Sequence, residues 1–154
     1  MILPDVNVLV YAFRPDSEHH RVCRSWLDGV VNGQEAYGMA PQVLGSFLRI
    51  VTNRRVFARP DRLEPALSYS ASLLEQPHCQ VIQPGARHWT IFTDVCRRAR
   101  ASGNLVADAW FAALAIESGC EWITTDRDYA RFDGLRWRSP LPPTLNGPTP
   151  KEAG

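Results

Sequence analysis

Short apolar runs alternate with longer segments of helical spacing along this chain of 154 residues. Five of the runs predict short strands: MILPD, AYGMA, CQVIQP, EWITTD and LRWRSP. Pro4 should lie at the C-terminal end of the first strand, because proline cannot donate a hydrogen bond to a β-ladder.

Helical spacing of apolar residues predicts five helices between these runs, at residues 17–31, 41–53, 60–74, 89–102 and 105–118. We expect Asp16 or Ser17 to cap the first helix, and Pro41 to occupy the first turn of the second. Gly103 should end the fourth. The fifth is apolar nearly all round and is followed by Gly119, so it should pack on more than one side.

Strands that alternate with helices predict an α/β fold, with a mostly parallel central sheet and helices on both of its faces. The length favours one domain, which we expect to span residues 1–141. Residues 142–154 are rich in Pro, Gly and Thr, so this segment is interpreted as a flexible C-terminal tail.

Charge and composition do not alter the predicted fold, but they exclude some classes of protein. The chain has 17 basic and 16 acidic residues, so it is not a polycation. Lys151 is the only lysine; arginine suits bidentate contact with phosphate, although a GC-rich genome also enriches it. No apolar run could cross a bilayer, no basic segment precedes the first apolar stretch, and the four cysteines are isolated. We therefore expect a cytoplasmic protein without a membrane partner.

Four aspartates interrupt or follow apolar stretches of the chain. Asp5 ends the first predicted strand, Asp126 and Asp128 follow the fourth, and Asp108 lies near the start of the last helix. Ligands of parallel α/β sheets bind beyond the carboxyl ends of the strands. Asp5, Asp108 and Asp126 are therefore expected to converge there, with the helix N-terminus helping to hold the Asp108 anion.

Several carboxylates in one place repel each other, so protons, arginines or a metal ion must neutralise them. Oxygen ligands with no His or Cys nearby suit Mg²⁺ or Mn²⁺. Taken singly, each acid has a simpler explanation, since aspartate also favours turns and helix starts. Asn7 either orients Asp5 or shapes the turn, and Thr124 and Thr125 either bond a ligand or finish a β-branched strand.

Three stretches resemble the PIN-domain family, and more narrowly the VapC-type toxins of bacterial toxin–antitoxin pairs: DVNVLVYAF, PQVLGSFLRIVTNRRVF and NLVADAWFAALAIESGCEWITTDRDYARFDGLRWRSPL. They occur in this order within residues 1–141, and the last is the most specific. The resemblance implies a three-layer α/β fold and a metal-dependent endoribonuclease that a cognate VapB-type antitoxin holds inactive. It also implies that Asp5, Asp108 and Asp126, with Asp128 as a fourth contributor, gather around Mg²⁺ or Mn²⁺.

Asn7 and Thr124 match positions that support the acids in this family. The family usually has a glutamate just before the FLR segment, where this chain has Ser46. The missing charge predicts weaker metal binding, or replacement by one of three other acids: Glu18, Glu35 or Asp94. It also leaves open a PIN-like RNA-binding or regulatory module with slow catalysis.

RNA over an acidic metal centre needs a basic rim, because phosphate contacts dominate affinity. The expected rim residues are Arg49, Arg54, Arg55 and Arg127. Apolar residues of the early helices that the core does not need should form a surface for an antitoxin helix or a second copy of the chain, including Val22, Trp26, Phe47, Leu48 and Val51. Three tryptophans lie in apolar patterns and are interpreted as core: Trp89, Trp110 and Trp122.

A third hypothesis is a receiver or phosphatase-like domain that uses Asp5 as a phosphoryl acceptor. The sequence speaks against it, because VN rather than a second acid follows Asp5 and no lysine precedes Lys151. The favoured hypothesis is a metal-dependent endoribonuclease whose partners are RNA, an antitoxin and a second copy of itself in a homodimer.

Overall fold

The computed structural model describes residues 1–143. Within them, the strands are β1 (Ile2–Pro4), β2 (Tyr37–Met39), β3 (Cys79–Val81), β4 (Glu121–Ile123) and β5 (Trp137–Arg138). The helices are α1 (Val6–Phe13), α2 (His20–Val31), α3 (Pro41–Val51), α4 (Leu63–Leu74), α5 (His88–Ala99), α6 (Asn104–Ser118) and the 3₁₀ helix η1 (Arg127–Arg131). The tail predicted at 142–154 lies outside the described residues, apart from Pro142 and Pro143.

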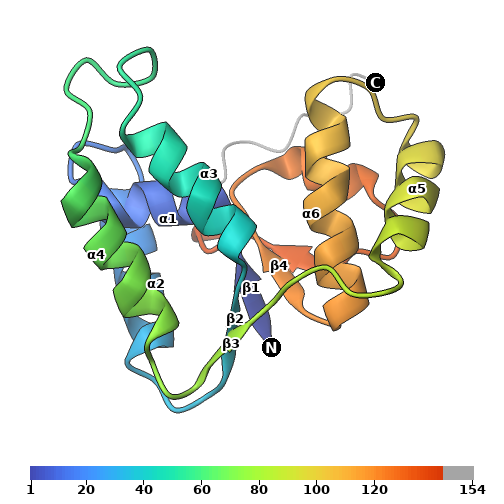
Figure 1. Ribbon diagram of the computed structural model, residues 1–154, viewed down its shortest axis with the longest axis horizontal. Coiled ribbons are helices and arrows are strands. Elements are labelled where there is room, and N and C mark those ends of the chain that lie inside the picture. The colour runs from blue at the N-terminus through green and yellow to red at the C-terminus, as the bar shows by residue number, and fades with distance from the viewer. Residues whose placement is uncertain (144–154) are drawn as a thin grey trace.

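All strand pairs are parallel in this part of the chain. β4 lies between β1 and β5, and β2 pairs with β3. β2 runs beside β1, since a Cβ atom at Gly38 would lie 3.3 Å from the carbonyl oxygen of Ile2. Figure 1 shows α1 to α4 on one side of the strands and α5 and α6 on the other. The predicted α/β fold with a parallel sheet between helices is confirmed.

The core forms where the strands meet α1, α3 and α6. Leu3 and Trp122 face each other in the β1–β4 register, and neither is exposed. α6 packs against both α5 and β4, as its nearly uniform apolar character predicts. Small buried side chains on α6 permit this close approach, namely Ala109, Ala112, Ala113 and Ala115. All four cysteines carry free thiols.

Helix α1 is the main element that the sequence pattern does not predict. Its β-branched, apolar residues are typical of a strand. The helix forms because the Asp5 side chain caps its N-terminus and because Val8, Leu9 and Ala12 are all fully buried. Burial in the core therefore overrides the local preference of these residues.

Two predicted helix ends also differ from the structure. α2 begins at His20, because Asp16 pairs with Arg14 and the Ser17 hydroxyl donates to backbone carbonyls instead of capping a helix. α5 ends at Ala99, before Gly103, because Arg100 takes the left-handed conformation with φ 49°.

The five apolar residues proposed for a partner surface divide into fully buried and partly buried ones. Phe47 and Val51 are fully buried, and the other three proposed surface residues, Val22, Trp26 and Leu48, pack against the core. Trp122 is buried as expected, but Trp89 is 65% exposed because it lies on the solvent side of α5. Within residues 1–143, no helix combines the length and apolar character needed to span a membrane.

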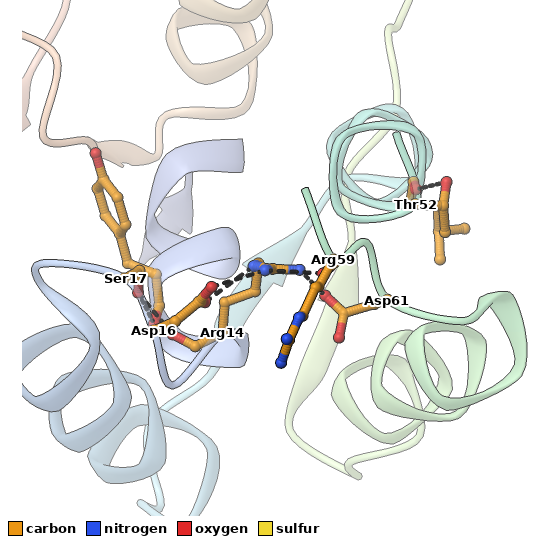
Figure 2. A network of polar contacts seen from close by, with 8 residues as sticks. Arg14, Asp16, Ser17, Thr52, Arg59 and Asp61 are labelled. Atoms are coloured by element: carbon orange, nitrogen blue, oxygen red, sulfur yellow. Dashed lines mark hydrogen bonds and ion pairs between the residues drawn. The ribbon is translucent and has the colours of Figure 1, made fainter. Parts of the chain in front are cut away.

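Arg14 anchors the loop between α3 and α4 to the C-terminal end of α1 (Figure 2). Its side chain is 6% exposed and bonds to the Asp61 carboxylate at 2.7 Å, to Asp16 at 2.8 Å and to the carbonyl oxygen of Arg59 at 3.2 Å. The Phe57 ring lies 3.7 Å from its guanidinium carbon. One buried cation therefore fixes a loop of more than ten residues.

Arg14→Met should lower the free energy of unfolding by about 2 kcal/mol, because it leaves Asp61 and the Arg59 carbonyl without their charged donor. Partial exposure of Asp61 lets water recover part of the loss. Arg24→Ala, which breaks the exposed Arg24–Asp28 pair, is the control and should cost less than about 0.5 kcal/mol. Urea denaturation of both variants measures this, and equal losses would contradict the anchoring role.

Candidate active site

Asp5 is a buried carboxylate at the carboxyl end of β1, where it caps α1. Its Oδ1 accepts a hydrogen bond from the backbone N–H of Val6 at 2.6 Å. Its Oδ2 accepts one from the Thr124 hydroxyl at 2.7 Å and one from the Asn7 side-chain amide at 3.1 Å. Three donors, two from the start of α1 and one from the end of β4, therefore hold this side chain in one orientation.

Thr124 and Asn7 join the ends of β1 and β4. The Thr124 hydroxyl accepts hydrogen bonds from the Asn7 amide at 3.1 Å and from the backbone N–H of Asp126 at 3.0 Å. The Asn7 carbonyl oxygen accepts from the backbone N–H of Thr125 at 3.2 Å. The structure thus places both predicted supporting residues in direct contact with Asp5 or with the loop that carries Asp126.

Asp126, Asp128 and Asp108 complete the acid cluster. Asp126 caps η1 and accepts a hydrogen bond from the backbone N–H of Asp128 at 2.9 Å. Asp108 lies one turn inside α6, not in its first turn, so the helix N-terminus is farther from it than expected. The hydroxyl of the buried Tyr129 donates to Asp108 at 3.4 Å.

Burial raises the pKa of Asp5 to about 7. The hydrogen bonds from Thr124 and Val6 act in the opposite direction, and the negative charges of Asp108 and Asp126 raise the pKa further. An uncharged carboxyl at neutral pH is thus about as stable here as a carboxylate, unless a cation enters the site.

Burial also raises the pKa of Asp108, and the charges of Asp126 and Asp128 add to the effect, while the Tyr129 hydrogen bond opposes it. Among the described residues, the neighbouring charges that shift the pKa values of Asp5 and Asp108 are all negative. Arginines therefore do not neutralise this cluster, and protons or a cation remain.

The donor set consists of carboxylate, hydroxyl and amide oxygens, which suits a hard divalent cation. Within residues 1–143, no three His, Cys, Asp or Glu side chains are placed so that they could hold a metal ion together. Mg²⁺ is commonly held through one or two carboxylates and several waters. The residues present fit that open mode of binding and not a closed protein cage.

Ser46, at the position of the family glutamate, lines a hollow of about 450 Å³ between α3 and α6, together with Ala107 and Phe111. The three proposed substitute acids lie elsewhere. Glu18 is 4.0 Å from His19, Asp94 pairs with Arg98 at 3.1 Å, and Glu35 lines a hollow beside Arg138. None of the three is among the charges that shift the pKa values of Asp5 and Asp108.

The predicted arginine rim is divided between two places. Arg49 is exposed in the last turn of α3, and Arg54 and Arg55 are exposed just beyond it. α3 starts beyond the carboxyl end of β2 and rises about 16 Å along its length, and these three arginines lie at or beyond its C-terminal end. Arg127 directly follows Asp126 and is exposed, so it is the predicted rim residue that stays beside the cluster.

Tyr129 is the site residue that the sequence analysis missed. Its position three residues after Asp126 is a weak signal, because a buried tyrosine in an apolar region is usually only part of the core. Here the hydroxyl reaches Asp108 from the 3₁₀ helix that also carries Asp128. A 3₁₀ turn directly after a strand would have to be predicted before that contact could be inferred.

Comparison with known proteins places the chain in a family. The PIN domain model matches residues 2–135. The VapC ribonuclease Mb2897 of Mycobacterium bovis is 43% identical over 141 residues, which cover 92% of this chain and 96% of that protein. Ribonuclease VapC25 of Mycobacterium tuberculosis is 39% identical over 136 residues, which cover 88% of this chain and 96% of that protein.

Solved structures share the fold at low identity. VapBC2 from Rickettsia felis, bound to a DNA fragment from its promoter, has a TM-score of 0.67 at 17% identity and covers 90% of this chain and 98% of that chain. VapC20 of Mycobacterium tuberculosis, a sarcin–ricin loop cleaving toxin, has a TM-score of 0.61 at 16% identity. The match covers 88% of this chain and 99% of that chain. The chain therefore belongs to the PIN-domain family. The relatives that match it at 39% to 43% identity are VapC ribonucleases.

Metal-free protein should lose stability as the pH rises from about 4 to about 7. Asp5 has a folded-state pKa of about 7 against an ordinary value of 3.8, so the folded state binds more protons in this window. The stabilisation is complete below the lower value and is lost as the pH passes the upper one. Asp5 should contribute at most about 1.4 kcal/mol per pH unit to this slope.

Urea denaturation in EDTA at several pH values measures this slope. Asp5→Asn should flatten it, whereas Asp94→Asn, an exposed acid of α5, should leave it unchanged. A slope in Asp5→Asn that parallels the wild type would show that Asp5 titrates normally.

Proposed function

We propose that this protein is a metal-dependent endoribonuclease that acts as the toxin of a toxin–antitoxin pair. The observation that carries the proposal is the gathering of Asp5, Asp108 and Asp126, from three distant parts of the chain, beyond the ends of β1 and β4. The ribonuclease names of relatives that align with nearly all of the chain support it.

One or two of the Asp5, Asp108 and Asp126 carboxylates, together with waters, would hold Mg²⁺ or Mn²⁺, with Asp128 at the edge of the cluster. When bound, such an ion lowers the pKa of a coordinated water and stabilises negative charge on the phosphate. The repulsion that raises the pKa values of Asp5 and Asp108 is the physical reason for a cation here.

The chain's own residues orient this chemistry. Thr124 and Asn7 fix the Oδ2 atom of Asp5, and the same threonine holds the backbone of Asp126. Tyr129 donates to Asp108 from the core side and limits the orientations of that carboxylate. Arg127, exposed next to Asp126, is positioned to contact the RNA backbone.

A catalytically weak RNA-binding module is the alternative, and the uncharged Ser46 in α3 is the observation that favours it. A phosphoryl-acceptor function of Asp5 is disfavoured, because the side chain is 5% exposed and both of its oxygens already accept hydrogen bonds. An attacking carboxylate oxygen needs free access to the phosphorus atom.

The proposed partners besides RNA are a VapB-type antitoxin and a second copy of the chain. Several solved structures with this fold are VapBC complexes, including one from nontypeable Haemophilus influenzae. We place the antitoxin in the hollow between α3 and α6, where Val106 is 37% exposed and the rings of Phe92 and Trp110 form apolar walls.

Asp5→Asn and Asp108→Asn should each reduce cleavage of total RNA by at least about 100-fold, because each removes a charge from the proposed cation site. EDTA should abolish cleavage by the wild type, and added Mn²⁺ or Mg²⁺ should restore it. Asp133→Asn, an exposed acid beyond η1, is the matched control. Cleavage in saturating EDTA, or wild-type rates in both variants, would refute the proposal.

Val106→Arg should weaken capture of the co-encoded antitoxin by at least about tenfold, because a charge would enter the apolar hollow. Val56→Arg, at a valine that is 52% exposed in the loop after α3, controls for added charge at an exposed valine. Calorimetric titration with purified antitoxin measures both affinities. Equal affinities for the two variants would place the antitoxin elsewhere.

A further inference from the structure

A second hollow, of about 360 Å³, lies beyond the carboxyl ends of β4 and β5. It is lined by Thr125, Arg127, Ala130, Trp137, Arg138 and Ser139. Thr125 and Arg127 are the residues on either side of Asp126, so the hollow adjoins the acid cluster without containing any of its carboxylates.

The walls of the hollow carry the groups that bind nucleotides. Arg127 supplies a guanidinium group, which suits bidentate contact with phosphate and stacking on bases. The partly exposed indole of Trp137 offers a flat face on which a base can stack. Thr125 and Ser139 add hydroxyl groups that can bond to a ribose or a base edge.

Hydrogen bonds fix these walls in place. The Arg138 Nε donates to the Glu121 carboxylate at 2.7 Å, which anchors that guanidinium. Trp137 and Arg138 form β5 and pair with β4. The backbone N–H of Thr125 donates to Asn7, which also holds Asp5, so the hollow and the acid cluster share one hydrogen-bond network. A ligand in the hollow would therefore lie in a fixed register with the acids.

We propose that this hollow is a nucleotide subsite, which binds the RNA residue next to the phosphate that lies at the acid cluster. The base stacks on Trp137, and the guanidinium of Arg127 bonds to the neighbouring phosphate. The volume is near the lower end of the ~300–1,000 Å³ range of small-ligand sites, which suits one nucleotide. The inference rests on the proposed ribonuclease function, because it assigns the hollow to the same substrate.

The test uses nucleoside monophosphates as probes, in EDTA, so that binding is measured without cleavage. Titration of the full chain with AMP, GMP, CMP and UMP should shift the indole N–H signal of Trp137 in NMR spectra. Arg127→Ala should weaken binding of the tightest probe about tenfold. Arg131→Ala removes another exposed arginine of η1 that does not line the hollow, and it should leave binding unchanged.

Trp137→Leu should also weaken binding, while Trp137→Phe, which keeps an aromatic face, should retain most of it. Thermal melting of both variants shows whether each is folded, and Arg127→Ala keeps the test decisive if Trp137→Leu is not. A Trp137 signal that does not move, or equal losses in Arg127→Ala and Arg131→Ala, would overturn the subsite.

Cleavage assays separate this inference from the proposed function. If the wild type cleaves RNA while no monophosphate binds and Arg127→Ala leaves KM unchanged, the subsite fails and the ribonuclease function stands. If monophosphates bind in the hollow while no RNA is cut with Mg²⁺ or Mn²⁺, the subsite stands and the catalytic proposal fails. A raised KM with little change in kcat for Arg127→Ala supports both.

Discussion

Burial of the Asp5 carboxylate is the constraint on which the rest of this structure depends. A carboxylate that leaves water must be given donors, or it stays protonated. Val6 and Asn7 supply two of them from α1, and Thr124 supplies the third from the end of β4. The same hydrogen bonds therefore start a helix, lock two central strands together and orient the first acid of the site.

Helix α1 has an ionisable residue at each end. Asp5 caps its N-terminus and Arg14 caps its C-terminus, which is the arrangement that the helix dipole favours. Arg14 is satisfied by Asp16, Asp61 and a carbonyl oxygen, whereas Asp5 lies among other acids that raise its pKa. The contacts of Arg14 thus stabilise the C-terminal end of the helix. At the N-terminal end, the crowding of Asp5 with other acids reduces stability, which is typical of a functional site.

Much of the fold could be predicted because the residues that begin and end its helices and strands act locally. Pro41 and Gly119 mark helix ends that the structure confirms. Strand ends alone predicted that Asp5 and Asp126 would lie at one edge of the sheet, where the Thr124 hydroxyl bonds to both residues. Helix α1 was missed because its conformation is decided by burial against residues far away in the sequence, and not by the local preference of its own residues. The assignment of Arg54 and Arg55 to an RNA-binding rim stays a prediction, because sequence proximity to α3 does not reveal which end of that helix faces the acids. The hollow beside Trp137 depends on the β4–β5 register, and the sequence of a two-residue strand is too short to predict that register.

The hydrogen bond from Thr124 to Asp5 joins residues 119 positions apart. A nascent chain carries Asp5 from the start of translation, yet it cannot close this contact until β4 has left the ribosome. Until then β1 has no partner on that side, and the acids at 108, 126 and 128 have not been made or are not in place. The order of synthesis therefore delays assembly of the acid cluster until almost the whole domain exists.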